Sequence, residues 1–128
     1  MSDTIPTLHL INQFFGGLGS EEHAGIAPRF FTGARGPGLL IQSTEPQLEI
    51  VGTIVFGDNF VAQYGDAACQ EVWSLVEQRI ADGSMPHPQL ILAGPAFQAG
   101  RYGLACSLLS RDLQSRLSVP AVVAMSPD

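Results

Sequence analysis

An arginine and a thiol stand among three glycines in the stretch GPAFQAGRYGLAC, residues 94–106. Arg101 lies where the apolar pattern downstream predicts the first turn of a helix. The free backbone N–H groups of such a turn attract anions, and a guanidinium can bind a carboxylate through two parallel hydrogen bonds. We therefore expect Arg101, with the N–H groups from Gly100 to Gly103, to bind a small carboxylate ligand. The alternative is a strand-to-helix turn with Arg101 in solvent.

Three further positions carry reactive side chains. Glu21 and Glu22 could form a general acid/base pair, because one of two neighbouring carboxylates tends to have a raised pKa; a solvated helix start is the alternative. Asp58 and Asn59 follow a buried strand and could bind a substrate amine or cap the next turn. Cys106 could be a nucleophile, but it falls on an apolar stripe, where a buried, inert thiol is the competing interpretation.

The composition excludes several kinds of chemistry. The chain has no lysine, so it cannot form a lysine Schiff base with a carbonyl substrate or with pyridoxal phosphate. Cys69 and Cys106 are far apart and form no CxxC motif, so neither a disulfide framework nor a metal site is predicted. His9 lies in an expected strand as a core histidine, whereas His23 follows the two glutamates and is the more interesting candidate.

Length and composition indicate one globular domain over residues 1–128. Hydrophobic residues make up 45% of the chain and charged residues 14%. The chain lacks an apolar stretch of about 18 residues, the length that crosses a bilayer, and its N-terminus does not resemble a signal peptide. The formal net charge of -6 argues against nucleic acid and anionic membranes as partners. We expect a cytoplasmic protein.

Apolar runs that alternate with helical patterns predict an α/β fold. The expected strands, which are apolar and rich in β-branched residues, lie near residues 7–15, 49–57, 89–94 and 120–125. The expected helices, which carry apolar residues at helical spacing, lie near residues 66–82 and 101–117. This order predicts a mostly parallel sheet of about four strands with helices on its faces, a Rossmann-like three-layer arrangement.

The segment between Gly16 and Pro46 has seven glycines, three prolines and no sustained period. It predicts a long functional loop, with a short helix near residues 21–26. Asp66 is expected to cap the next helix, and Asp82 with Gly83 to end it.

Ligands of open α/β sheets bind beyond the carboxyl ends of the strands. Those ends carry the strings NQFFGGLGSEEH, GDNF, GPAFQAGRYG and SPD in this chain. We therefore expect these four segments to meet around a ligand crevice.

Four strings carry a resemblance to a known family. INQFFGGLGSEEHA, VFGDNF, AGPAFQAGRYGLAC and VPAVVAMSPD resemble, in the same order, the selenoprotein B component of glycine, sarcosine, betaine and D-proline reductases. The resemblance covers nearly the whole chain but only the N-terminal portion of the family's length.

The resemblance implies a subunit of a thiol- or selenol-dependent reductase that cleaves a C–N bond in a small amino-acid-like substrate. In such enzymes a selenocysteine or cysteine attacks the carbon that bears the nitrogen, a pyruvoyl group on a partner binds the amine in some members, and a dithiol reduces the enzyme. The implied catalytic candidates are Glu22 and Cys106. The implied substrate-binding candidates are Asn12, Gln13, Glu21, Gly57, Asp58, Asn59, Gly100, Arg101 and Tyr102. The alternatives are a relative that cleaves another C–N or C–S bond and a non-catalytic binding or assembly subunit.

Departures from the family pattern indicate where the missing chemistry lies. The chain has no selenocysteine, and His23 and Phe56 stand where members often carry lysine and cysteine. We expect this chain to bind no cofactor, and a partner subunit to supply the nucleophile, any pyruvoyl group and the rest of the fold. Two expected helices are too few to cover both faces of the sheet, so apolar surface and an unpaired strand edge would stay exposed. This predicts that the chain is not a stable monomer.

Overall fold

The computed structural model describes residues 3–97 and 100–126. Its strands are β1 (Ile5–Asn12), β2 (Arg29–Thr32), β3 (Leu48–Phe56), β4 (Leu90–Phe97) and β5 (Ala121–Ser126). Its helices are the 3-10 helix η1 (Glu21–His23) and the α-helices α1 (Pro37–Thr44), α2 (Asp58–Tyr64), α3 (Asp66–Ala81) and α4 (Arg101–Leu117). Gln98 and Ala99 of the glycine-rich stretch, and Pro127 and Asp128 of the last motif, lie outside the described residues.

The five strands form one sheet in the order β2-β3-β1-β4-β5. β1 pairs in parallel with both β3 and β4, and β4 pairs in parallel with β5. The expected mostly parallel α/β sheet is therefore confirmed. The four expected strands are present, and β2 is an additional fifth strand that pairs antiparallel with β3.

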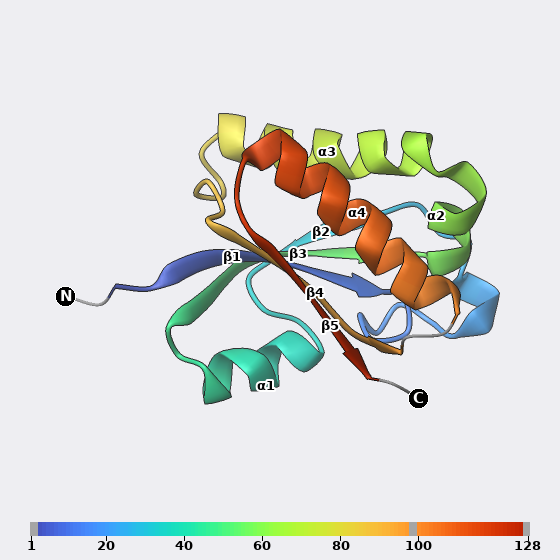
Figure 1. Ribbon diagram of the computed structural model, residues 1–128, viewed down its shortest axis with the longest axis horizontal. Helices are drawn as coiled ribbons and strands as arrows, with labels where there is room; N and C mark the ends of the chain where they lie inside the picture. Colours follow the sequence, from blue (N-terminus) through green and yellow to red (C-terminus); the bar gives the residue numbers. More distant parts are fainter. Residues whose placement is uncertain (1–2, 98–99, 127–128) are drawn as a thin grey trace.

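The sheet separates two layers of helices (Figure 1), with α2, α3 and α4 over one face and α1 over the other. Residues from Ile50 to Phe56 on β3 are all buried, as expected for a parallel strand covered on both faces. The main core lies under α3 and α4, where Val72, Leu109 and Leu113 are fully buried. This packed layer joins α4 to the sheet, and the first residues of α4 lie at the carboxyl ends of the strands.

The expected long loop after β1 contains regular structure, so that expectation was wrong in part. β2 lies there, paired with β3 between Arg29↔Val55 and Thr32↔Gly52, and so does α1, which has Pro at its start and buries only Gly38. A helix with so little buried surface shows no apolar period, because no face of it has to be hydrophobic. The predicted helix near residues 21–26 is a single 3-10 turn.

Helix boundaries were predicted with mixed success. α4 has the expected bounds, and α3 ends at Ala81 with Asp82 as its C-cap. Asp66 is the first residue of α3 and makes no side-chain cap, because Gly65, with φ +44°, is the N-cap between α2 and α3. α2 was not anticipated.

β1 is shorter at its carboxyl end than predicted. It stops at Asn12 rather than near residue 15, since the side-chain oxygen of Asn12 accepts a hydrogen bond from the Phe15 backbone N–H at 3.0 Å. The chain turns back toward the sheet at this point. The segments after β1 and β3 and the start of α4 consequently gather at one edge of the sheet, at the right of Figure 1.

No helix within the described part of the chain is long and apolar enough to cross a membrane.

Candidate functional site

Asn12, the last residue of β1, anchors the edge of the sheet where the site forms. Its side-chain amide is buried, and Nδ2 donates a hydrogen bond to Oδ2 of Asp58 at 2.8 Å. Gln13 follows and is also buried. Its Oε1 accepts a hydrogen bond from the backbone N–H of Asp58 at 3.1 Å, and its Nε2 donates to the carbonyl of Ser20 at 3.5 Å. Both amides therefore position the start of α2 and the loop around it.

Asp58 is the buried charge of the site. Its side chain is 8% exposed, and Oδ1 accepts hydrogen bonds from Nε and Nη2 of Arg101 at 3.1 and 3.0 Å. A carboxylate at the first turn of a helix is also stabilised by the helix dipole. The Asn12 amide, the Arg101 guanidinium and the α2 dipole together compensate a charge that burial alone would destabilise.

Arg101 is the first residue of α4, and its side chain is 41% exposed. Besides Asp58 it binds Oε2 of Glu21 at 2.7 Å. The hydrogen bond that Arg101 donates to Glu21, followed by those that it donates to Asp58, raises the pKa of Arg101 above its ordinary value. In this structure Arg101 pairs with two carboxylates of the chain itself instead of lying unpaired in solvent, and the expected ligand carboxylate stays a prediction.

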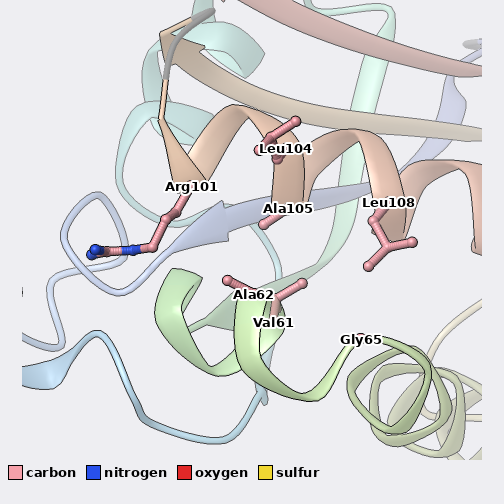
Figure 2. Close-up of a pocket in the computed structure, with 7 residues that line it drawn as sticks. All are labelled: Val61, Ala62, Gly65, Arg101, Leu104, Ala105 and Leu108. Carbon is pink, nitrogen blue, oxygen red and sulfur yellow. The ribbon is translucent and has the colours of Figure 1, made fainter.

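Two cavities flank this ion-pair cluster. The first has a volume of about 280 Å³. It is lined by Asn12, Gln13, Phe14, Phe15, Ser20, Glu21, Asp58 and Tyr102. The second, of about 330 Å³, is an apolar groove in which Val61 and Ala62 of α2 lie opposite Ala105 and Leu108 of α4, with Arg101 at one end (Figure 2). Since Glu21 and Asp58 line the first cavity and Arg101 lines the second, the ion pairs lie between them.

Tyr102 and Cys106 lie behind the cluster, on the buried side of α4. The Tyr102 ring stacks on Phe15, and its hydroxyl is buried with no hydrogen-bond partner among the described residues. Burial, with a smaller contribution from Cys106, raises the pKa of Tyr102 far above its ordinary value.

Cys106 is fully buried. Burial, with a smaller contribution from Asp58, raises the pKa of its thiol to about 12. A thiol that is both inaccessible and protonated is a poor nucleophile, so this geometry favours the packing interpretation of Cys106 over the catalytic one. Cys69 is buried as well, and burial raises its pKa to about 11.

Several predicted residues lie away from the first cavity. Successive residues of a 3-10 turn point about 120° apart, so Glu22 diverges from Glu21 and contacts Ser20 instead, at 3.1 Å. Asn59 is exposed on α2, and its backbone N–H donates to the carbonyl of Ala24 at 2.8 Å. The structure therefore does not place Glu22 or Asn59 in the site.

The two glycines among the candidates have local structural roles. Gly57 packs against the backbone of Ala24 and Ile26, with no room for a Cβ atom. Gly100 is the N-cap of α4 with φ +100°, a conformation that favours glycine. Neither lines the first cavity.

His9 is a core histidine, as predicted, but only one of its ring nitrogens is satisfied. Nε2 donates to the carbonyl of Gly94 at 2.6 Å, and Nδ1 is buried without a partner among the described residues. Burial lowers the pKa of His9, opposed in part by the hydrogen bond to Gly94. Within the described ranges no group of three or more His, Cys, Asp or Glu side chains is arranged to hold a metal ion.

Three lining residues were not singled out from the sequence: Phe14, Phe15 and Ser20. Phe14 is 61% exposed, and the only signal in the sequence is that two phenylalanines directly precede the paired glycines Gly16 and Gly17. The Ser20 carbonyl accepts a hydrogen bond from the Gln13 side chain, a contact that no sequence pattern indicates.

An open, mostly parallel sheet with a charged cavity at the carboxyl ends of its strands defines the class of α/β proteins that bind ligands at this edge. Within that class, residues 4–128 match the model of the family described as glycine/sarcosine/betaine reductase selenoprotein B. The chain belongs to this family. The resemblance noted from its sequence motifs is thereby confirmed.

Curated relatives carry names of the same kind. The chain is 39% identical over 119 residues to the glycine reductase complex component B subunit gamma of Symbiobacterium thermophilum. It is 35% identical over 122 residues to the sarcosine reductase complex component B subunit beta of Peptoclostridium acidaminophilum, and 36% identical over 115 residues to the betaine reductase complex component B subunit beta of the same organism.

These alignments cover 92%, 94% and 90% of the chain but 26%, 26% and 25% of the respective relatives. The chain therefore spans about a quarter of the length of these relatives. No solved structure matches it.

Proposed function

We propose that the chain is part of a reductase subunit and binds the carboxylate end of a small amino-acid-like substrate whose C–N bond is reductively cleaved. The observation that carries this proposal is Arg101, which a buried aspartate holds in place between the two cavities while the arginine side chain stays 41% exposed. A guanidinium fixed in this way is ready for a carboxylate before the ligand arrives. Family membership indicates which carboxylates to test, namely glycine, sarcosine and betaine.

Each polar group of the cluster has a role in this proposal. Arg101 and the N–H groups at the start of α4 bind the ligand carboxylate. Asp58 holds the guanidinium in position through two hydrogen bonds, and Asn12 in turn holds Asp58. The nitrogen end of the ligand then faces Glu21, which lines the first cavity, on the other side of the ion pair.

We place the nucleophile outside this chain. Cys106 is buried with a raised pKa, and the chain has neither selenocysteine nor lysine. A selenol or thiol on another component of the complex would attack the carbon that bears the nitrogen, the amine would leave with a proton, and a dithiol would supply the two electrons that release the reduced product. A pyruvoyl group on that component would supply a carbonyl for the amine where the substrate requires it. The cavity residues of this chain bind and orient the substrate.

Two exposed apolar features support association with such a partner. β5 pairs with β4 alone among the described strands, and Val122 and Met125 on it are 49% and 38% exposed. Leu104 on α4 is 72% exposed at the apolar groove. Since the relatives are named as components of complexes, we propose that these surfaces contact another component of such a reductase complex, in the cytoplasm.

The substitution Arg101→Lys tests the carboxylate site, because an ammonium cannot reproduce the planar two-donor fork of a guanidinium. A charge-assisted hydrogen bond contributes about 1.5 to 3 kcal/mol, so turnover of glycine, sarcosine or betaine at limiting concentration should fall by about one to two orders of magnitude. The reaction is measured with the partner subunits present.

Arg116→Lys is the matched control. Arg116 is also on α4 and pairs with Asp112 at 2.8 Å, but unlike Arg101 it lines neither of the two cavities. This variant should react like the wild type. Equal turnover by Arg101→Lys and the wild type would contradict substrate binding here and favour an assembly role, for which the apolar groove at Leu104 is the specific observation.

A further inference from the structure

The two carboxylates on Arg101 are held very differently. Asp58 is 8% exposed, and Asn12 also binds it. Glu21 is 78% exposed and lies on a three-residue 3-10 turn that buries none of its residues. Within the described part of the chain, the side-chain carboxylate of Glu21 has a hydrogen bond to Arg101 alone. One partner of the guanidinium is therefore fixed, and the other is attached only through the guanidinium itself.

An exposed ion pair of this kind is readily exchanged. Solvent screening and the side-chain entropy lost on pairing limit its effect on an equilibrium to no more than about fivefold. A ligand carboxylate with further contacts in the cavity can therefore replace Glu21 on Nη2 of Arg101, whereas it cannot replace the buried Asp58 without leaving an uncompensated charge.

We propose that Glu21 occupies the position of the substrate carboxylate and exchanges with it on binding, which makes Glu21 a specificity-determining residue of this site. This inference rests on the proposed function. The exchange frees the Glu21 carboxylate at the edge of the first cavity, where it faces the nitrogen end of the ligand. An amino acid then inserts into the ion pair with both of its charges matched, while a plain carboxylate leaves Glu21 without a cation.

The substitution Glu21→Gln separates these effects. It removes the competing carboxylate, so acetate, which has no amine, should bind about two- to fivefold more tightly. Glycine gains in the same way but loses its ammonium partner. The ratio of the acetate dissociation constant to the glycine dissociation constant should therefore fall by about two- to fivefold. Both are measured by calorimetric titration of the full chain in the assembly with which it purifies.

Glu22→Gln is the matched control, because it changes the net charge by the same amount one residue away, on a side chain that contacts Ser20 rather than Arg101. Its acetate and glycine affinities should equal those of the wild type. The Nε–H resonance of Arg101 in nitrogen-15 NMR spectra gives a direct readout. It should shift in Glu21→Gln, and in the wild type on addition of acetate, but not in Glu22→Gln.

The outcomes distinguish the exchange from the function on which it rests. If Arg101→Lys binds acetate and glycine like the wild type, the proposed function fails and the exchange with it. If Arg101→Lys weakens binding but Glu21→Gln behaves like Glu22→Gln, the carboxylate site stands and the exchange is wrong. Tighter acetate binding in Glu21→Gln alone, with the fall in the affinity ratio, supports the exchange.

Discussion

Asp58 is the residue on which the geometry of the candidate site depends. It joins the end of β1, through Asn12, to the start of α4, through Arg101. These three side chains come from segments that are 46 and 43 residues apart in the chain. The ion pair therefore acts as a tertiary contact as well as a support for the guanidinium.

Asp58→Asn is expected to destabilise the protein and to weaken substrate binding. An asparagine offers only one side-chain oxygen, so its N–H groups would face the donors of Asn12 or Arg101. Leaving such donors unsatisfied costs about 1 to 3 kcal/mol in the free energy of unfolding. Urea unfolding followed by circular dichroism measures this loss.

The control for Asp58→Asn is Asp112→Asn, which removes a carboxylate from an ion pair four residues apart on α4. Pairs of this kind contribute about 0.2 to 0.5 kcal/mol. Equal losses in the two variants would show that Asp58 contributes no more than a surface pair.

At the scale of elements, the backbone of residues 24–26 crosses over the start of α2 and is hydrogen-bonded to it. This contact sets the position of η1, which directly precedes these residues. The backbone N–H groups of Gly57 and Asn59 donate to the carbonyls of Ile26 and Ala24 at 3.2 and 2.8 Å. This contact is tight, because a Cβ atom on Gly57 would lie 2.6 Å from the Ile26 carbonyl oxygen. Glu21 is carried by the turn just before this crossing.

Gly57→Ala should therefore lower the free energy of unfolding by about 1 to 3 kcal/mol, the usual effect of overpacking, and should disturb the Glu21–Arg101 pair. Gly25→Ala is the matched control, since a Cβ atom there meets no other atom within 4 Å. Thermal melts of both variants provide the measurement. If Gly57→Ala were as stable as Gly25→Ala, the crossing would have to be looser than the structure indicates.

At the scale of the whole molecule, the free energy of unfolding should depend on pH through His9. This residue is on β1, the middle strand of the sheet, and its ring nitrogens lie near Gly94 of β4 and Gly38 of α1. Burial lowers its pKa below the ordinary value of 6.5. As the pH falls below about 6.5 the unfolded chain binds a proton at this residue that the native protein does not, so the free energy of unfolding decreases by up to about 1.4 kcal/mol per pH unit. Above that pH His9 is neutral in both states and contributes no pH dependence.

Urea unfolding at several values between about pH 5 and pH 7 tests this. In His9→Asn the free energy of unfolding should change less steeply with pH than in the wild type. His87→Asn, which alters an exposed histidine, should keep the wild-type slope. A slope unchanged by His9→Asn would contradict the lowered pKa.

The local part of the fold could be predicted from the sequence. The apolar runs in β3 and β4 and the apolar stripe along α4 identify these elements. Side chains that face the core must be apolar, so apolar residues recur along the sequence with the period of the helix or strand. β2, α1 and α2 could not be found in this way. β2 is a four-residue strand at the edge of the sheet, and α1 buries a single glycine, so neither is required to show a pattern.

The place of Arg101 was also readable from the sequence, since Arg101 had to lie at the carboxyl edge of the sheet once α4 began there. The partners of Arg101 were not. They are 43 and 80 residues away in the chain, and a sequence period describes only neighbours on one element. Only the tertiary structure decided that Asp58 and Glu21 reach the same guanidinium, that one of them is buried and the other exposed, and that Cys106 faces the core, because these properties follow from how separate elements pack together.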